Sequence, residues 1–259
     1  SIRRCQCPNP ASGECPCDRG WRGGGYTDAG SAVTPAEFEI LFTSLHVAAL
    51  AVICSLPFAI AAAFALSRPR LPGKLALDGL VHLPVILPPV LVGFILLILL
   101  GRRGLVGGWL EQVFGLHLAF TTQGAALATA VMTFPLFVRS IRLAFEATDA
   151  RLFEAAALLR AGPLDRFLTV ALPLAWPGIV AGAVMAFAAA MGEFGAVITF
   201  AGNIPGQTQT LPLAIYAVLQ QPNGEAQAWR LAAASLAVAL AGLGGAELLQ
   251  RWARGRLTK

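Results

Sequence analysis

Long apolar stretches without charge restrict the fold of this chain more than any other feature. Four contain no Asp, Glu, Lys or Arg and a fifth is interrupted only by Glu247; they cover residues 44–66, 79–100, 118–138, 167–192 and 231–250. A helix needs about 20 mainly apolar residues to cross a bilayer. Only 13% of all residues are charged, against about 25% in soluble domains. The sequence therefore predicts an all-α, polytopic membrane protein with about five transmembrane helices.

A sixth uncharged stretch, residues 194–224, has a different composition. It is rich in Asn, Gln, Thr, Gly and Pro. Irregular backbone at membrane depth must be buried in protein or line water. We expect a re-entrant or partly helical segment on the outer side, with six spans as the alternative.

Basic residues alternate between the loops that join these stretches. If the first loop is cytoplasmic, twelve of them lie inside: Arg68, Arg70, Lys74, Arg139, Arg142, Arg151, Arg160, Arg166, Arg251, Arg254, Arg256 and Lys259. Beyond residue 33, only Arg102, Arg103 and Arg230 lie outside. The positive-inside rule then predicts an outer N-terminus and a cytoplasmic C-terminus. The alternation also accounts for the net charge of +5 without a nucleic-acid partner.

Residues 1–33 lack apolar periodicity and are rich in Gly, Pro and Arg. Their cysteines form two C-x-C pairs, Cys5 with Cys7 and Cys15 with Cys17. Common structural zinc sites use C-x2-C pairs or nearby histidines, so we predict no metal site here. We expect a disordered extension, then a membrane domain over residues 34–254 and a cytoplasmic tail over residues 255–259.

Catalytic signatures are missing from the sequence. It has three histidines and no H-E-x-x-H, G-x-S-x-G or Walker A pattern. We therefore predict neither enzymatic activity nor a cofactor, and any energy source must be another chain. An ion-coupled carrier usually has an ionisable residue within a span, and here only Glu193 and Glu247 come near. Glu247 is placed to pair with Arg251 one turn later, whereas Glu193 is either an interfacial acid or a residue beside a permeation path.

A charged segment, residues 149–173, separates the third and fourth apolar stretches, and we call it the elbow. Asp149 is expected to cap a short helix, and Gly162-Pro163 to end that helix and start a second one. The second helix, residues 164–172, runs into Pro173 and the fourth span. The elbow is thus predicted to be a helix–turn–helix along the cytoplasmic surface, and an ordinary amphipathic connector is the simpler alternative.

One motif in the elbow resembles a known family. Glu154-Ala155-Ala156, followed by Gly162, Phe167, Leu172-Pro173 and Pro177-Gly178-Ile179, resembles the EAA loop of ABC-importer permeases, which docks into a groove on the ATPase subunit. The resemblance implies ATPase coupling by Glu154, Ala155, Ala156, Arg160, Gly162, Pro163, Phe167 and Pro173. The glycine usually found six residues after the glutamate is Arg160 here, which implies a turn that is shifted or charged.

Two positions are expected to set the geometry of the elbow. Glu154 orients the first helix, either through the helix dipole or by pairing with Arg151 or Arg160. Gly162-Pro163 sets the angle between the two helices, so a bulky residue at Gly162 is expected to weaken coupling.

Three further strings narrow the resemblance. Residues 83–89 (LPVILPP), 192–196 (GEFGA) and 200–216 (FAGNI followed by TQTLPLAIY) are similar to those of the molybdate permease, the membrane subunit of the molybdate or tungstate ABC importer. The similarity covers residues 34–254. It implies a multi-pass permease of the cell inner membrane that works as a homodimer with two ATPase copies and a periplasmic molybdate-binding protein. Candidate path residues are Glu193, Asn203, Thr208, Gln209 and Thr210.

Other functions remain open at this point. A sulfate or thiosulfate importer would carry the same EAA loop. An intramembrane enzyme or ion-coupled carrier needs ionisable groups at bilayer depth, which the uncharged spans disfavour. A purely structural subunit is disfavoured by the polar stretch 202–210, because such residues at a membrane face usually line water or protein.

Overall fold

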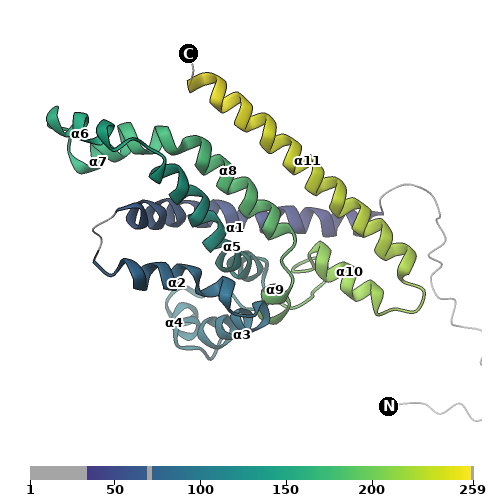
Figure 1. Cartoon of the computed structure of the whole chain (residues 1–259). Coiled ribbons are helices and arrows are strands. Elements are labelled where there is room, and N and C mark those ends of the chain that lie inside the picture. The colour runs from purple at the N-terminus through teal and green to yellow at the C-terminus, as the bar shows by residue number, and fades with distance from the viewer. Residues whose placement is uncertain (1–33, 69–71, 258–259) are drawn as a thin grey trace, which may run out of the picture. The chain divides into compact units, whose positions relative to one another are not determined.

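The computed structural model describes residues 34–68 and 72–257, and every regular element within these ranges is a helix. In chain order, shown in Figure 1, they are α1 (Pro35–Ser67), α2 (Lys74–Ile86), α3 (Pro89–Leu100), α4 (Leu105–Phe114), α5 (Thr122–Glu146), α6 (Ala150–Leu158), α7 (Pro163–Arg166), the π-helical turn η2 (Phe167–Ala171), α8 (Leu172–Met191), α9 (Gly195–Phe200), α10 (Leu211–Leu219) and α11 (Glu225–Leu257). The prediction of an all-α fold is confirmed. The expected extension over 1–33, with its cysteines, and Arg70 and Lys259 lie outside the described residues.

Helices α1, α5 and α8 pack against one another at the centre of the fold. Their contacting surfaces contain many alanines, and Ala59, Ala63 and Ala175 are fully buried. Small side chains let helix backbones approach closely, which matters in a bilayer because apolar burial there gives little driving force. The two helices α5 and α8 come close together at Gly178 of α8, where an added Cβ would lie 2.2 Å from the Cβ of Ala144 on α5.

Three helical stretches in the described part of the chain are long and apolar enough to cross a membrane: Pro35–Ser67, Thr122–Glu146 and Pro163–Met191. The bent pair α2 and α3 would make a fourth span. The fifth predicted span, residues 231–250, lies within α11, which continues through residue 254 to Leu257. The polytopic all-α membrane fold is therefore confirmed, and the number of five spans stays a prediction.

The expectation of one continuous transmembrane helix over residues 79–100 needs correction. This stretch contains parts of two helices, α2 and α3, that are bent by 112° relative to each other. Leu87 between them is extended, with φ −78° and ψ 144°. A residue before proline is forced out of the helical region, and Pro88 and Pro89 have no N–H to continue the helix. Hydropathy alone did not reveal the break, because no charged residue interrupts residues 79–100.

Residues 194–224 form two short helices, α9 and α10, joined by an irregular loop. With 6 and 9 residues, neither is long enough to cross a bilayer at 1.5 Å per residue. The prediction of a partly helical segment is confirmed, and this stretch supplies no sixth span. Helix α9 packs closely on α3, where an added Cβ on Gly93 would lie 2.3 Å from Oγ1 of Thr199.

Loops that the charge pattern assigned to opposite sides lie at opposite ends of these helices. The ends of α1 and α5 and the end of α7 line one cavity, through Arg68, Thr148 and Arg166. At the other end, Glu37 pairs with Arg230 at 3.3 Å, between the starts of α1 and α11. The hydroxyl of Thr122 at the start of α5 donates to the carbonyl of Gln207 at 2.9 Å. Which end faces the cytoplasm stays a prediction.

Candidate coupling surface and permeation path

The first helix of the elbow, α6, begins where the sequence predicts. The carboxylate of Asp149 accepts a hydrogen bond from the backbone N–H of Arg151, with the two atoms 2.9 Å apart. This bond satisfies one of the N–H groups that the first turn of a helix leaves free. The predicted capping by Asp149 is thus confirmed.

The helix ends in a turn centred on Arg160. The N–H of Ala161 donates to the carbonyl of Ala156, and Arg160 has a left-handed φ of 58°. This is the Schellman ending, in which glycine is usually the left-handed residue. The turn has therefore not shifted to Gly162, which has φ −65° and ψ 166°. Arg160 adopts the left-handed conformation that glycine usually has at this position, and its side chain adds a positive charge to the turn.

Gly162 does not restrict the elbow as expected. Its φ is accessible to any residue, and a Cβ added there would meet nothing within 4 Å. Within this chain, the change of direction comes from the left-handed Arg160 and from Pro163, which lies in the first turn of α7. The expectation that bulk at Gly162 disturbs the elbow is therefore not supported by the geometry of the chain.

The second helix of the elbow is continuous with the membrane span. Helix α7, the turn η2 and α8 form one stretch from Pro163 to Met191. The N–H of Leu172 donates to the carbonyl of Phe167, the spacing of a π turn. Pro173 follows directly and has no N–H to donate to the preceding turn. The wider π turn accommodates the proline, which cannot form this hydrogen bond. A displacement of the elbow can therefore pass into α8 along one continuous helix.

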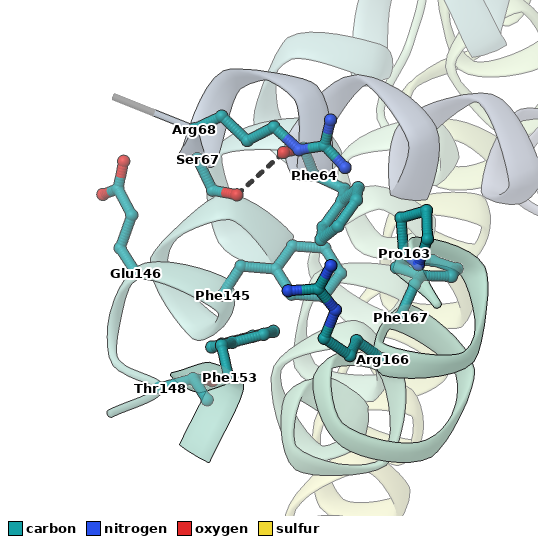
Figure 2. A pocket seen from close by; sticks show the side chains of 10 residues that line it. All are labelled: Phe64, Ser67, Arg68, Phe145, Glu146, Thr148, Phe153, Pro163, Arg166 and Phe167. Atoms are coloured by element: carbon teal, nitrogen blue, oxygen red, sulfur yellow. Dashed lines mark hydrogen bonds between the residues drawn. The ribbon is translucent and has the colours of Figure 1, made fainter. Parts of the chain in front are cut away.

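Phe167 anchors the elbow to two other spans, as Figure 2 shows. Its ring centroid lies 4.6 Å from that of Phe64 on α1 and 6.3 Å from that of Phe145 on α5. The rings of Phe64 and Phe145 are 5.5 Å apart in an edge-on arrangement. Such aromatic pairs contribute about 0.5–1.5 kcal/mol beyond their burial. The sequence identified Phe167, but its two partners come from distant helices and no local pattern marked them.

The outer surface of the elbow is exposed and apolar. Leu158 and Leu159 at the end of α6 are 86% and 84% exposed, and the leucines with exposed side chains in this segment are Leu152, Leu158, Leu159, Leu164 and Leu168. Ala155 is exposed beside them, and Ala156 is half-buried. An exposed apolar patch rimmed by charged residues is typical of a protein interface.

Glu154 is exposed on this surface. Within the described part of the chain, no ion pair joins its carboxylate to Arg151 or Arg160, so neither predicted pairing is present. It also lies beyond the first turn of α6, where the dipole effect has faded. Its carboxylate is thus available to a second molecule rather than used to orient the helix.

The candidate path residue Glu193 lies between α8 and α9. Its Oε1 accepts a hydrogen bond at 2.9 Å from the backbone N–H of Ala196, and the side chain is half-buried. It therefore caps α9, a structural role that sequence reasoning missed. Gly195 beside it is tightly packed, since an added Cβ would lie 2.6 Å from the Cβ of Pro89.

The other four candidate path residues lie in the loop between α9 and α10. The hydroxyl of Thr208 accepts from the N–H of Ile204 at 3.0 Å and donates to the carbonyl of Gly202 at 3.2 Å, so this buried side chain closes the loop. Gln209 is half-buried. Asn203 and Thr210 each have a buried side-chain oxygen without a hydrogen-bond partner in the described part of the chain. No hydrogen bond among the described residues joins Glu193 to these four side chains.

Comparisons with known proteins agree with this architecture. The chain matches the family model described as "Binding-protein-dependent transport system inner membrane component" over residues 55–255. It is 50% identical to the molybdenum transport system permease protein ModB of Escherichia coli (strain K12), over 86% of this chain and 98% of that protein. It is 44% identical to ModB of Haemophilus influenzae, over 86% of this chain and 96% of that protein. It is 39% identical to the putative molybdenum transport system permease protein YvgM of Bacillus subtilis, over 77% and 88%.

Solved structures support the fold. A bacterial ABC transporter involved in the import of the acidic polysaccharide alginate superposes with a TM-score of 0.67 at 17% identity, covering 87% of this chain and 81% of that one. An amino acid ABC transporter superposes with a TM-score of 0.56 at 20% identity, covering 84% and 94%. With a family match over most of its length and relatives of nearly equal extent, the chain belongs to the inner-membrane permease family of binding-protein-dependent transport systems.

Proposed function

We propose that this chain forms the membrane path of an ABC importer for molybdate. It is a multi-pass permease of the inner membrane and not an enzyme, and ATP is hydrolysed on a separate subunit. The proposal of molybdate as cargo rests on relatives at 39–50% identity that are named as molybdenum transport permeases. Nothing in the fold favours sulfate or thiosulfate as the cargo. In our proposal, the binding protein discriminates between molybdate and tungstate.

The observation that carries the coupling mechanism is the exposed elbow, whose second helix continues into a span. The exposed leucines of α6 and Glu154 face outward, whereas Phe167 packs on Phe64 and Phe145. In our proposal, the outer surface docks on the ATPase. ATP binding displaces the elbow, and the continuous helix from Pro163 to Met191 carries this displacement into the membrane.

The proposed assembly contains two copies of the permease, two ATPase subunits and a periplasmic molybdate-binding protein, with the N-terminus outside and the C-terminus in the cytoplasm. The twelve basic residues at the proposed cytoplasmic end support this orientation. We assign the path to the region of Glu193, Asn203, Thr208, Gln209 and Thr210. The uncharged spans contain no Arg or Lys to hold a divalent oxyanion tightly, which suits a conduit of low affinity.

Charge reversal at Glu154 tests the coupling surface. We expect Glu154→Lys to weaken co-purification of the ATPase and to reduce molybdate uptake, while the permease still inserts into the membrane. The matched control is Glu225→Lys, because Glu225 is also exposed but begins α11 at the opposite end of the helices. Full ATPase binding and full uptake in Glu154→Lys would show that the elbow is only a connector. Competition of labelled molybdate uptake by tungstate and by sulfate tests the cargo.

A further inference from the structure

A cavity of about 640 Å³ opens between the ends of α1 and α5 and the elbow, as Figure 2 shows. Its walls include the rings of Phe64, Phe145 and Phe153. Two arginines border these rings, Arg68 just after α1 and Arg166 at the end of α7. An aromatic floor with cations at its edge suits a molecule that is apolar at one end and anionic at the other.

The other polar groups around the cavity are satisfied within the chain, and Nε of Arg166 donates to the carbonyl of Gly162 at 3.5 Å. The carboxylate of Glu146 pairs with Arg142 at 2.7 Å, and the hydroxyls of Ser67 and Thr148 donate to backbone carbonyls. In the described part of the chain, no carboxylate lies within ion-pair distance of Arg68 or Arg166. The guanidinium of Arg68 lies 4.5 Å from the ring centroid of Phe64. Two arginines without a carboxylate partner therefore line one opening.

A second hollow of about 390 Å³ adjoins the cavity and shares Phe64, Arg68, Pro163 and Phe167 with it. Its remaining walls are the apolar side chains Ala61, Ala65 and Leu164. The cavity that the two arginines border thus continues along α1 into the second hollow, whose walls are mainly apolar. A small free oxyanion would make no favourable contact with the apolar walls of the second hollow, whereas an acyl chain can pack against them.

The two arginines also lie at the edges of apolar stretches. Arg68 follows residues 44–66, and Arg166 directly precedes residues 167–192. Side chains at these positions lie at the level of lipid headgroups, where basic residues between helices suit anionic headgroups on the cytoplasmic side.

We propose that this cavity binds an anionic phospholipid of the cytoplasmic leaflet, with its phosphate at Arg68 and Arg166 and one acyl chain along Ala61 and Ala65. The inference rests on the proposed orientation, in which this end of the fold is cytoplasmic. Phe167 of the elbow lines both the cavity and the second hollow, so a bound lipid packs between α1 and the helix that leads into α8. The lipid therefore lies next to the proposed ATPase-docking surface.

Native mass spectrometry of the purified permease–ATPase complex tests the site, with phosphatidylglycerol and phosphatidylcholine as probes. We expect wild type to retain phosphatidylglycerol over phosphatidylcholine, and the double variant Arg68→Gln/Arg166→Gln to retain at least tenfold less. The control Arg102→Gln/Arg103→Gln removes the same charge from exposed positions at the other end and should retain wild-type amounts. Ala61→Trp keeps the charges and fills the apolar hollow, so it should also lose lipid.

Three results would overturn the proposal. The first is equal retention of phosphatidylglycerol by wild type and the Arg68/Arg166 variant. The second is displacement of the lipid by inorganic phosphate with unchanged binding in Ala61→Trp, which indicates a free-anion site. The third is loss of the ATPase from the arginine variant with unchanged lipid, which assigns the arginines to the subunit interface. Because lipid is counted directly, failure here leaves the proposed transport of molybdate untouched, and loss of uptake alone does not support the lipid site.

Discussion

The guanidinium of Arg142 on α5 lies 2.9 Å from the carboxylate of Asp78 on α2, and it also contacts Glu146 one turn along α5. This contact ties the first half of the broken α2–α3 pair to the central helices. The Arg142 side chain is 26% exposed and that of Asp78 41%. The ion pair is therefore partly screened by water, and its contribution is modest.

A double-mutant cycle measures this contact. We expect Asp78→Asn and Arg142→Gln each to lower the thermal midpoint in detergent, with a coupling of about 0.5–1 kcal/mol between them. The more exposed pair Arg102 and Glu111 serves as the control and should show weaker coupling. Additive effects at Asp78 and Arg142 would mean that α2 is held by its apolar contacts alone.

Close packing between α5 and α8 depends on Gly178. We expect Gly178→Ala to destabilise the protein by about 1–3 kcal/mol, because the new Cβ overlaps Ala144 and forces the helices apart. Adding Ala144→Gly should restore most of the loss. Gly79→Ala in α2 is the control, since a Cβ there meets nothing within 4 Å. A Gly178→Ala variant as stable as wild type in thermal melts would contradict this packing.

A substitution at the left-handed residue Arg160 is expected to stabilise the structure, unlike the change at Gly178. Glycine adopts this conformation without the cost of about 1–2 kcal/mol that other residues have. Arg160→Gly should therefore stabilise the elbow, measured as slower hydrogen exchange in α6. Gly162→Ala is the matched control and should be neutral, because Gly162 has an ordinary φ and free space. Faster exchange in Arg160→Gly would show that the guanidinium makes a stabilising contact.

Thr208 is expected to hold the loop between α9 and α10 rather than bind cargo. Thr208→Val removes both hydrogen bonds of a fully buried hydroxyl, at a cost of about 1–3 kcal/mol, whereas Thr208→Ser keeps them. We expect the valine variant to lose thermal stability and uptake together, and the serine variant to resemble wild type. Reduced uptake at unchanged stability in the valine variant would instead point to a direct role in the path.

Two substitutions at Glu193 distinguish its structural role as a helix cap from a role of its charge in transport. Glu193→Gln keeps an oxygen that accepts from the N–H of Ala196 and removes the charge, whereas Glu193→Ala removes both. We expect the glutamine variant to fold and assemble like wild type but to show altered molybdate uptake. The alanine variant should also be less stable. Wild-type uptake in Glu193→Gln would leave capping of α9 as its only role.

The sequence by itself was sufficient for the membrane class, the apolar stretches, the cap at Asp149 and the position of the elbow. These features depend on neighbours along the chain. Apolar length is a local property, and a cap needs only a carboxylate two residues before a free N–H. The strings around Glu154 and Glu193 also carried the family, because their residues follow one another at short spacings along the chain.

Only the tertiary structure decided which distant residues meet. It showed that Phe167 packs on Phe64 and Phe145, that Gly178 is needed because Ala144 lies against it, and that Thr208 closes a loop. It also showed that α2 and α3 are bent by 112° relative to each other and that α3 packs against α9. The hydropathy of a segment is a sum over its own residues and contains no information about the segment that packs against it. Close packing, in contrast, depends on the shapes of both segments.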